Sequence, residues 1–326
     1  MRLRKTNFTA VWCASGARNF DGKGWWFHDY LKPFGLNYEG STFQAKTTTL
    51  EARAGNMPLR EDGLTPIEHQ PKCIIVKPFK GIALNAVGLS GPGAEQLFKM
   101  GTWQKRTEPF VLSFMSVGKT AQERQQELAT FCVMLKLHLT EFKAPVALTV
   151  NFSCPNAGLK LMDLHTEVTK SLSIAGGIGI PLIAKFNALL PPEAAYHLGE
   201  HPDLDAICMS NTIPWGSLPE RIDWKRLFGS ETSPLAHLGG GGLSGKPLKP
   251  IVLDWIRAAR RNSYKKPIIA CGGILCPDDA IEMLEAGANA VELGSMSFLR
   301  PWNIGRTIHA VHAWTKQHPN HTGVSP

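Results

Sequence analysis

The sequence predicts a single (β/α)8 barrel, and three observations support this fold. Short β-branched or apolar runs alternate with amphipathic helical patterns, which is typical of a parallel sheet. A chain of 326 residues has room for about eight such strand–helix units. A doubly wound sheet is the main alternative, but the G-x-G-x-x-G motif expected after its first strand is absent. Because no repeat, low-complexity tract or linker divides the chain, we expect residues 1–326 to form one domain.

The predicted elements follow from hydrophobic patterning. Strands are predicted at 41–49, 109–114, 146–152, 182–186, 206–209, 267–270 and 290–293. Helices are predicted at about 121–142, 248–261 and 279–286. In the first helix Leu128, Phe131 and Leu135 recur at helical spacing. We expect Asp278 or Asp279 to cap the last helix and Gly287 to end it.

Polar groups cluster at the predicted strand ends, where a barrel carries its catalytic residues. The segments read QAKTTT, LNAVGL, VNFSCPN, IAKFN, MSNT, ACGGI and ELGSM. Almost every one contains a lysine, an asparagine, a hydroxyl group or glycines. A purely structural barrel would not need this clustering, so we expect an active site at the carboxyl ends of the strands.

The composition excludes several classes of protein. No apolar run approaches the roughly 20 residues that span a bilayer, and an early apolar stretch is broken by Asn7 and Thr9, so we expect neither membrane insertion nor a secretory signal. The seven cysteines form no C-x-x-C pair, which predicts reduced thiols in the cytoplasm and no metal site. The net charge of +8 would suit an anionic ligand or nucleic acid, but the basic residues are scattered, which favours a solvated surface.

Three glycine segments predict a phosphate-bearing cofactor. Gly272-Gly273 and Gly294-Ser295 follow the last two predicted strands, where this fold usually binds phosphate. Bare backbone amides can close around phosphate oxygens there, helped by the dipoles of helix N-termini. A third glycine loop is predicted at 239–245, before the helix that starts near Leu248. One glycine pair alone would more simply be a turn.

Two strand lysines and one cysteine are the candidate reactive groups. Lys46 and Lys185 lie in apolar strands, and facing one pocket they would bind a negatively charged ligand. A single strand lysine would more simply extend outward to solvent. Cys154 ends a strand at a Ser-Cys-Pro-Asn turn, and nearby positive charge would make its thiol a general base. The alternative reading of Cys154, which fits Cys132 better, is a small buried apolar residue.

Asparagines add donors and acceptors suited to the edge of a flat heterocycle. They are Asn85, Asn151, Asn156 and Asn211. Any one of them alone would more simply be a turn or cap residue. Their position near one predicted rim favours a binding role.

Taken together, these motifs resemble the dihydroorotate dehydrogenase family. The resemblance rests on VNFSCPNAG, GGLSGKPL and ACGGI…DDAIEMLEAGANAVELGS, with ASG at 14–16, AKTTT, GNMP at 55–58 and LNAVGLSGPG at 84–93. It implies an FMN-containing barrel that oxidises (S)-dihydroorotate to orotate in pyrimidine synthesis, by proton removal from C5 and hydride transfer from C6 to flavin N5. Having cysteine where the membrane-associated enzymes have serine, the chain resembles the soluble class 1.

The resemblance also implies roles for individual residues. Cys154 matches the base, and Lys185 matches the lysine beside the flavin pyrimidine ring. The positions that match substrate-binding residues are Lys46, Asn85, Asn151, Asn156, Asn211 and Thr212. The positions that match flavin-binding stretches are Ser15, Gly16, Lys46, Thr47, Asn151, Lys185, Gly241, Gly242, Cys271, Gly272, Gly273, Gly294 and Ser295.

The chain also departs from the family pattern. Gly91, in GLSG, replaces an asparagine that often contacts orotate in the family. The segment 59–80 reads as an insertion, and 215–238 is unfamiliar. Either segment could alter the side that meets the electron acceptor or an oligomer contact.

Partners and competing functions stay open at this point. The resemblance implies a homodimer that uses fumarate, or a partner subunit carrying FAD and an iron–sulfur cluster that uses NAD; quinone is a third acceptor. One alternative is a flavin barrel acting on another pyrimidine or on uridine in tRNA, like dihydrouridine synthases. These usually need an extra helical domain, whereas little more than one helix follows Pro301, so we expect no nucleic-acid partner. The other alternative is a non-catalytic barrel that binds a phosphorylated ligand.

Overall fold

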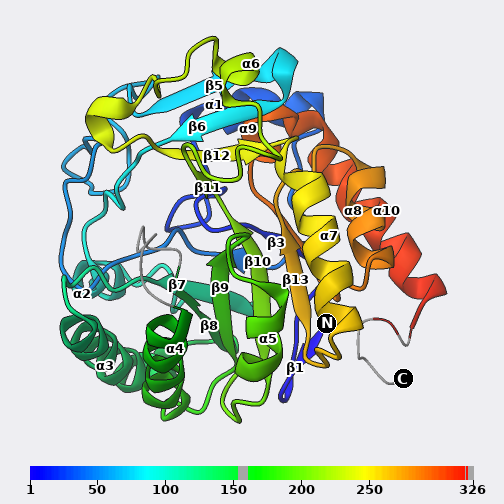
Figure 1. The fold of residues 1–326 in the computed structure, drawn as a ribbon. Coiled ribbons are helices and arrows are strands. Elements are labelled where there is room, and N and C mark those ends of the chain that lie inside the picture. Colours follow the sequence, from blue (N-terminus) through cyan, green and yellow to red (C-terminus); the bar gives the residue numbers. More distant parts are fainter. Residues whose placement is uncertain (153–160, 320, 322–326) are drawn as a thin grey trace.

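A closed parallel barrel forms the centre of the molecule (Figure 1). The computed structural model describes residues 1–152, 161–319 and 321. In chain order, the barrel strands are β3 (Val11–Cys13), β4 (Phe43–Gln44), β7 (Phe110–Phe114), β8 (Val146–Asn151), β9 (Leu182–Asn187), β10 (Ala206–Asn211), β13 (Ile268–Cys271) and β14 (Ala290–Leu293). The eight strands neighbour one another in the order β3-β14-β13-β10-β9-β8-β7-β4. Thr42 joins the two ends, since its amide donates to Val11 (2.8 Å) and its carbonyl accepts from Cys13 (2.9 Å).

Helices surround the barrel (Figure 1). They are α1 (Trp26–Leu31), α2 (Ala94–Lys99), α3 (Ala121–His138), α4 (Leu161–Gly176), α5 (Pro192–Gly199), α6 (Trp224–Phe228), α7 (Leu248–Arg261), α8 (Pro277–Glu285), α9 (Met296–Leu299) and α10 (Ile304–Gln317). Short 3-10 turns are η1 (Lys32–Phe34), η2 (Pro78–Lys80), η3 (Leu139–Glu141), η4 (Ala236–Leu238) and η5 (Pro301–Asn303). The main apolar core lies between the outer faces of the strands and these helices, with Leu128, Phe131 and Leu135 of α3 among its buried residues. Within the part of the chain that is described, no helix is both long and apolar enough to cross a membrane.

The predicted barrel fold is confirmed, and most predicted elements match it closely. Strands β7, β8, β9, β10, β13 and β14 begin and end within two residues of the predicted positions. The sequence does not predict β3, because its three residues are too few to show a pattern. The predicted strand at 41–49 is correct only at β4 and at two bridges, one between Trp12 and Thr42 and one between Thr48 and Phe114.

Two helix predictions need correction at their ends. The helix predicted to reach residue 142 ends at His138, where η3 continues it. The helix predicted at about 279–286 is α8, and its N-cap residue is Cys276, not Asp278 or Asp279. Asp279 lies in the first turn of α8, and its carboxylate accepts hydrogen bonds from the amides of Leu275 (2.8 Å) and Cys276 (3.1 Å). It therefore stabilises the start of the helix without being its N-cap residue.

A second, antiparallel sheet lies over the carboxyl end of the barrel (Figure 1). Its order is β11 (Ile213–Pro214), β12 (Gly242–Gly245), β6 (Ile82–Asn85) and β5 (Ile74–Lys77). Two predictions were therefore wrong. The segment LNAVGL ends a strand of this sheet and not of the barrel, and residues 242–245 of the predicted glycine loop form a strand. Glycine suits β12 because a Cβ at Gly242 would clash with Thr212.

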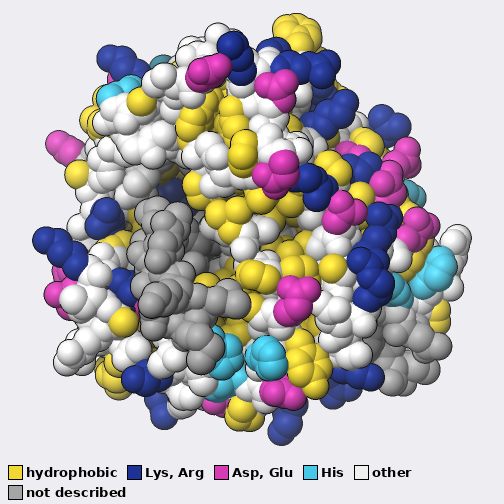
Figure 2. Space-filling view, in the orientation of Figure 1, with side chains coloured by type: hydrophobic (Ala, Val, Ile, Leu, Met, Phe, Trp, Pro, Cys, Tyr) yellow, Lys and Arg dark blue, Asp and Glu magenta, His cyan; other side chains and the backbone are white. Residues whose placement is uncertain are grey.

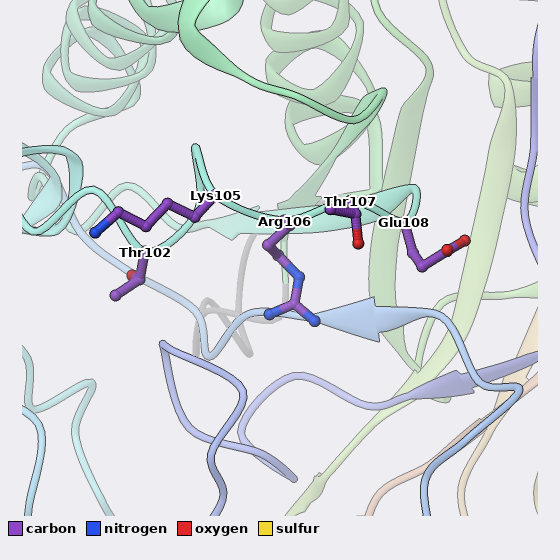
Figure 3. Close-up of a pocket in the computed structure, with 5 residues that line it drawn as sticks. All are labelled: Thr102, Lys105, Arg106, Thr107 and Glu108. Carbon is purple, nitrogen blue, oxygen red and sulfur yellow. The ribbon is translucent and has the colours of Figure 1, made fainter.

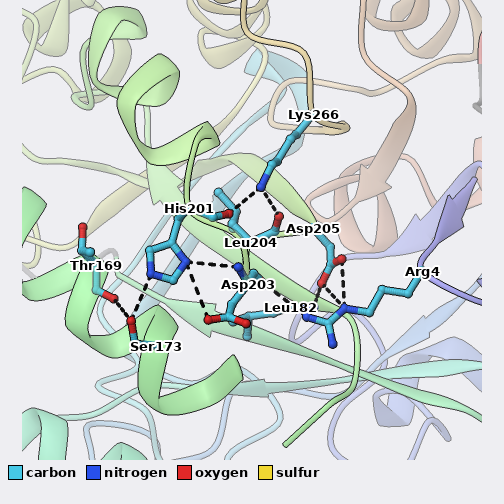
Figure 4. A network of polar contacts seen from close by, with 9 residues as sticks. All are labelled: Arg4, Thr169, Ser173, Leu182, His201, Asp203, Leu204, Asp205 and Lys266. Carbon is cyan, nitrogen blue, oxygen red and sulfur yellow. Dashed lines mark hydrogen bonds and ion pairs between the residues drawn. The ribbon is translucent and has the colours of Figure 1, made fainter. Parts of the chain in front are cut away.

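The amino-terminal end of the barrel is closed. A hairpin of β1 (Arg2–Leu3) and β2 (Thr6–Asn7) brings Leu3 into the interior apolar cluster with Trp12 and Ile183. Arg4 donates from Nε to both carboxylate oxygens of Asp205 (3.0 and 2.9 Å), as Figure 4 shows. The carboxyl end is therefore the end at which the barrel interior can receive a ligand.

Candidate active site

Most of the predicted site residues lie at the carboxyl end of the barrel or in the sheet above it. Cys154 and Asn156 lie outside the described residues. The others fall into small groups that are connected by hydrogen bonds, strand pairing or close packing. These groups define the chemistry of the site.

Lys185 lies inside the barrel and forms a buried ion pair. Its Nζ donates to Oε2 of Glu292 at 2.6 Å, and the two side chains are 5% and 0% exposed. Lys185 is on β9 and Glu292 on β14, strands that β10 and β13 separate, so the contact crosses the barrel interior. Burial opposes the charge of Lys185, but Cys208, Cys271 and Glu292 raise its pKa well above the usual value. The carboxylate is the neighbour that carries a full negative charge.

A layer of polar side chains surrounds this pair. The Sγ of Cys271 lies 3.9 Å from the lysine Nζ. Burial raises the pKa of Cys271 to about 12, so its thiol is neutral at physiological pH. Thr149 Oγ1 is 3.1 Å from the Gln44 amide. With the amide nitrogen turned toward Glu292, Gln44 donates to Oε1 at 3.3 Å. Both carboxylate oxygens of Glu292 then accept hydrogen bonds.

Lys46 has a different environment. The side chain is buried, its Nζ contacts the carbonyl oxygen of Ser90, and it lies 4.4 Å from the centre of the Phe20 ring. No carboxylate pairs with it among the described residues. Burial lowers the pKa of Lys46 to about 7. Such a group favours an incoming anion, because the anion would supply the missing countercharge.

Hydroxyl groups form a chain across three neighbouring strand ends. Ser15 Oγ and Thr47 Oγ1 are 2.8 Å apart, and Thr47 Oγ1 is also 2.8 Å from Ser113 Oγ. The Thr47 amide donates to Ser15 Oγ at 2.8 Å. The segments after β3 and β4, both predicted to bind flavin, are therefore held together.

Two asparagines meet between β8 and β10. Asn211 Nδ2 donates to Asn151 Oδ1 at 3.2 Å, while Asn211 Oδ1 accepts from the Thr212 amide at 2.8 Å. Asn151 is the register partner of Lys185. Asn151, Asn211 and Lys185 therefore lie close together at this end of the barrel.

Asn85 reaches this end of the barrel through the second sheet. It pairs with Gly242 of β12, and its Nδ2 lies 3.5 Å from the Gly242 carbonyl oxygen. Gly242 in turn packs against Thr212. At Gly241, which has φ +81°, a Cβ would lie 2.9 Å from the Asn85 carbonyl oxygen. Asn85 and Thr212 are thus connected through glycines that no larger residue could replace without a shift.

The glycines after β13 and β14 pack closely against neighbouring segments. Gly272 and Gly273 have φ values of +121° and +78°, and a Cβ at Gly273 would clash with the Lys249 amide nitrogen at the start of α7. A Cβ at Gly294 would lie 3.2 Å from the Ala14 Cβ. Ser295 begins α9. Both glycine segments thus lie at the carboxyl end of the barrel, where this fold usually binds phosphate.

The comparisons with known proteins agree with this geometry. The family model for dihydroorotate dehydrogenase matches residues 25–312. The chain belongs to the dihydroorotate dehydrogenase family. It is 30% identical over 285 residues to the catalytic subunit of dihydroorotate dehydrogenase B (NAD(+)) from Listeria monocytogenes, covering 84% of this chain and 81% of that protein. It is 33% identical over 274 residues to dihydroorotate dehydrogenase A (fumarate) from Lactobacillus delbrueckii, covering 81% and 78%.

A solved structure shows the same fold. The Eimeria tenella DHODH in complex with ferulenol aligns with a TM-score of 0.66 at 19% identity, covering 99% of this chain and 86% of that chain. The dihydroorotate dehydrogenase family is in general flavin-dependent.

Gly91 departs from the pattern expected for the dihydroorotate dehydrogenase family, and the structure gives a steric reason. A Cβ at Gly91 would lie 2.7 Å from Cζ of Phe20, which is 1% exposed. The Phe20 ring also lies over Lys46. The pair of Phe20 and Gly91 therefore takes the place of a larger residue at position 91, next to the unpaired lysine.

Sequence reasoning missed Glu292, Gln44 and Phe20. Glu292 carries the same signal as Lys185, a charged residue inside an apolar strand, in AVEL and LIAKFN. A charged residue in an apolar strand can be noticed in the sequence, but the sequence does not show that Lys185 and Glu292 contact each other. Gln44 and Phe20 have no signal of this kind, because an amide or a ring in a short segment has many uses.

Outside this site, the surface shows a scattered distribution of charge and a pocket among the described residues. Basic side chains lie mostly around the margin of the face in Figure 2, while apolar side chains gather near its centre. A surface pocket lined by Thr102, Lys105, Arg106, Thr107 and Glu108 lies just before β7 (Figure 3). It is at the amino end of that strand and so is separate from the candidate active site.

Proposed function

We propose that this protein binds FMN and oxidises (S)-dihydroorotate to orotate in pyrimidine biosynthesis. Family membership supports the reaction, and so do the names of both bacterial relatives. The observation that carries the proposal is Lys46, a buried cation without a carboxylate partner among the described residues. Dihydroorotate is a carboxylate, and its charge would satisfy this lysine.

The residues present fit a flavin. The glycine segments Gly272-Gly273 and Gly294 would offer backbone amides to a phosphate at the rim. The hydroxyl groups of Ser15 and Thr47, which are 2.8 Å apart, would meet polar edges of the flavin. Lys185 supplies a buried positive charge from the barrel wall. The same set, with Gly16, Gly241, Gly242, Cys271 and Ser295, is our proposed flavin site. When bound, FMN supplies the acceptor for the hydride removed from the substrate.

The chain's own groups would bind and orient the substrate. Lys46 would hold the carboxylate by a charge-assisted hydrogen bond. Asn151 and Asn211, fixed by their mutual hydrogen bond, would meet the donors and acceptors of the pyrimidine ring. Asn85 and Thr212 would act from the second sheet, and we assign Asn156 to the same role.

Proton removal is assigned to Cys154. A thiol has an ordinary pKa of about 8.5, and a nearby positive charge favours the thiolate that can act as a base. The base would take the proton from substrate C5 while the opposite side of the ring faces the cofactor. Replacing this thiol should stop proton removal without removing the flavin site.

The test is the anaerobic reduction of the bound flavin by dihydroorotate, which is monitored by stopped-flow absorbance. Wild-type protein should lose its oxidised flavin absorbance, whereas Cys154→Ala should bind FMN normally and lose most of this reaction at neutral pH. Cys132→Ala is the matched control, because Cys132 is a buried thiol of α3 with a pKa raised by burial to about 12. Unchanged reduction in Cys154→Ala would remove this cysteine from the mechanism. Absence of reduction in wild-type protein would refute the proposed reaction.

The electron acceptor and the assembly belong to the same proposal. The relatives include a fumarate enzyme and the catalytic subunit of an NAD(+) enzyme. We propose a cytoplasmic class 1 homodimer, with an FAD and iron–sulfur subunit as the alternative partner. Reoxidation of the reduced flavin with fumarate, NAD or quinone, each tested alone, would identify the acceptor.

A further inference from the structure

The ion pair of Lys185 and Glu292 lies where ionic groups are costly. The carboxylate is fully buried and the ammonium nearly so. Removing two charges from water costs several kcal/mol per ion, and the attraction between the ions often does no more than offset this cost. An apolar pair would fill the same barrel interior. The position of the carboxylate therefore needs a reason beyond stability.

The orientation of the pair suggests that reason. Lys185 reaches across the interior to Glu292, and the register places Lys185 beside Asn151, which belongs to the proposed site. Gln44 and the thiols of Cys208 and Cys271 also contact the carboxylate, and burial raises the pKa of both thiols, so these neighbours carry no charge. The Lys185 ammonium thus lies inside the barrel at the level of Asn151, with a countercharge 2.6 Å away.

We infer that Glu292 is a positioning residue that neutralises most of the Lys185 charge and thereby lowers the reduction potential of the bound flavin. The inference rests on the proposed function. A cation beside a flavin stabilises its reduced, more electron-rich form, so a paired cation stabilises that form less. Low local dielectric makes the effect large, since water does not screen buried charges. The carboxylate makes the reduced cofactor a stronger electron donor.

The test is the midpoint potential of bound FMN in wild-type and Glu292→Gln protein, measured by anaerobic reduction with dithionite and reference dyes. No substrate is present, so the measurement does not depend on the reaction. It is made at pH 6, because burial opposes the charge of a Lys185 that has lost its carboxylate partner and a low pH favours the protonated form. We expect the equilibrium constant for reduction to rise at least tenfold, which is a shift of about +30 mV for two electrons.

Two further variants separate charge from shape. Glu292→Asp keeps the negative charge, and its potential should stay close to that of wild type. The double variant Lys185→Met/Glu292→Met buries no ion, so it also decides the matter if Glu292→Gln does not fold. Its equilibrium constant for flavin reduction should lie within about threefold of the wild-type value. The reason is that two uncharged side chains replace an ion pair whose charges largely cancel.

The outcomes are distinct. An unchanged or more negative potential in Glu292→Gln would overturn the inference, as would an equal shift in Glu292→Asp or a large negative shift in the double variant. FMN-loaded wild-type protein that dihydroorotate cannot reduce would overturn the proposed reaction and leave the measurement of potential valid. A protein that takes up no FMN would overturn both.

Discussion

Lys46 and Lys185 are both buried at the same end of one barrel, but their surroundings are opposite. Lys185 is paired with Glu292 at 2.6 Å, and its pKa is raised. Lys46 contacts a carbonyl oxygen and an aromatic ring, and burial lowers its pKa to about 7. One lysine keeps a permanent charge, while the other carries a charge that a ligand must stabilise. In the proposed function, this difference corresponds to a role of Lys185 toward the cofactor and a role of Lys46 toward the substrate.

The largest expected effect is on stability, and it should distinguish the two lysines. Lys185→Met leaves the Glu292 carboxylate buried without a partner, so the free energy of unfolding should fall by about 3–5 kcal/mol. Urea unfolding followed by circular dichroism would measure this. The double variant Lys185→Met/Glu292→Met should recover most of the loss.

Lys46→Met is the contrasting variant in the same measurement. It removes a buried cation that has no acidic partner among the described residues, so the free energy of unfolding should stay unchanged or rise. An equal loss of stability in Lys46→Met and Lys185→Met would show that the two environments are not opposite.

The next effect concerns ligand binding. Hydrogen bonds to charged groups contribute about 1.5–3 kcal/mol, so Lys46→Met should weaken orotate binding by roughly 10- to 150-fold. Isothermal titration of the FMN-loaded protein would measure this. Flavin affinity should change much less, and a comparable loss of both would assign Lys46 to the cofactor.

The environment of Lys46 should resist change at position 91. Gly91→Ala places a Cβ 2.7 Å from the Phe20 ring, so overpacking should cost about 1–3 kcal/mol of stability. Phe20→Leu should relieve the clash, which makes the double variant more stable than the sum of the single changes predicts. Additive losses in thermal unfolding would show that the two positions are not in contact.

The smallest effect is a dependence on pH. The folded-state pKa of Lys46 lies near 7, below the ordinary lysine value of 10.5, so the unfolded chain binds more protons between these values and this lysine makes stability rise with pH. Orotate binding should show the opposite trend, since it needs the charged form. Affinity should fall by up to about tenfold per pH unit above pH 7, and Lys46→Met should abolish this dependence.

The sequence predicts the barrel well because each barrel strand from β7 onward has its own apolar run and most are followed by a clear helix. It also finds Lys46 and Lys185, since a charge inside an apolar strand stands out. It cannot find the pairing of Lys185 with Glu292, because the contact crosses the barrel between strands that are not neighbours. The second sheet escapes detection for a similar reason, since β6 pairs with β12, which lies 157 residues away at the Asn85 and Gly242 position.

The second sheet has a consequence for how this protein can vary. Residues 215–241 leave from β11 and return to β12, and Pro214 and Gly242 at the two ends are paired across the sheet. The start and finish of this excursion are thus adjacent in space. Ile222, Trp224 and Leu235 share a buried cluster with Ile82 and Leu84 of β6, so changes of length that leave this cluster intact need not disturb the barrel. This outer surface can therefore differ between members of the family, and with it the molecules that bind there, while the residues at the carboxyl end of the barrel stay the same.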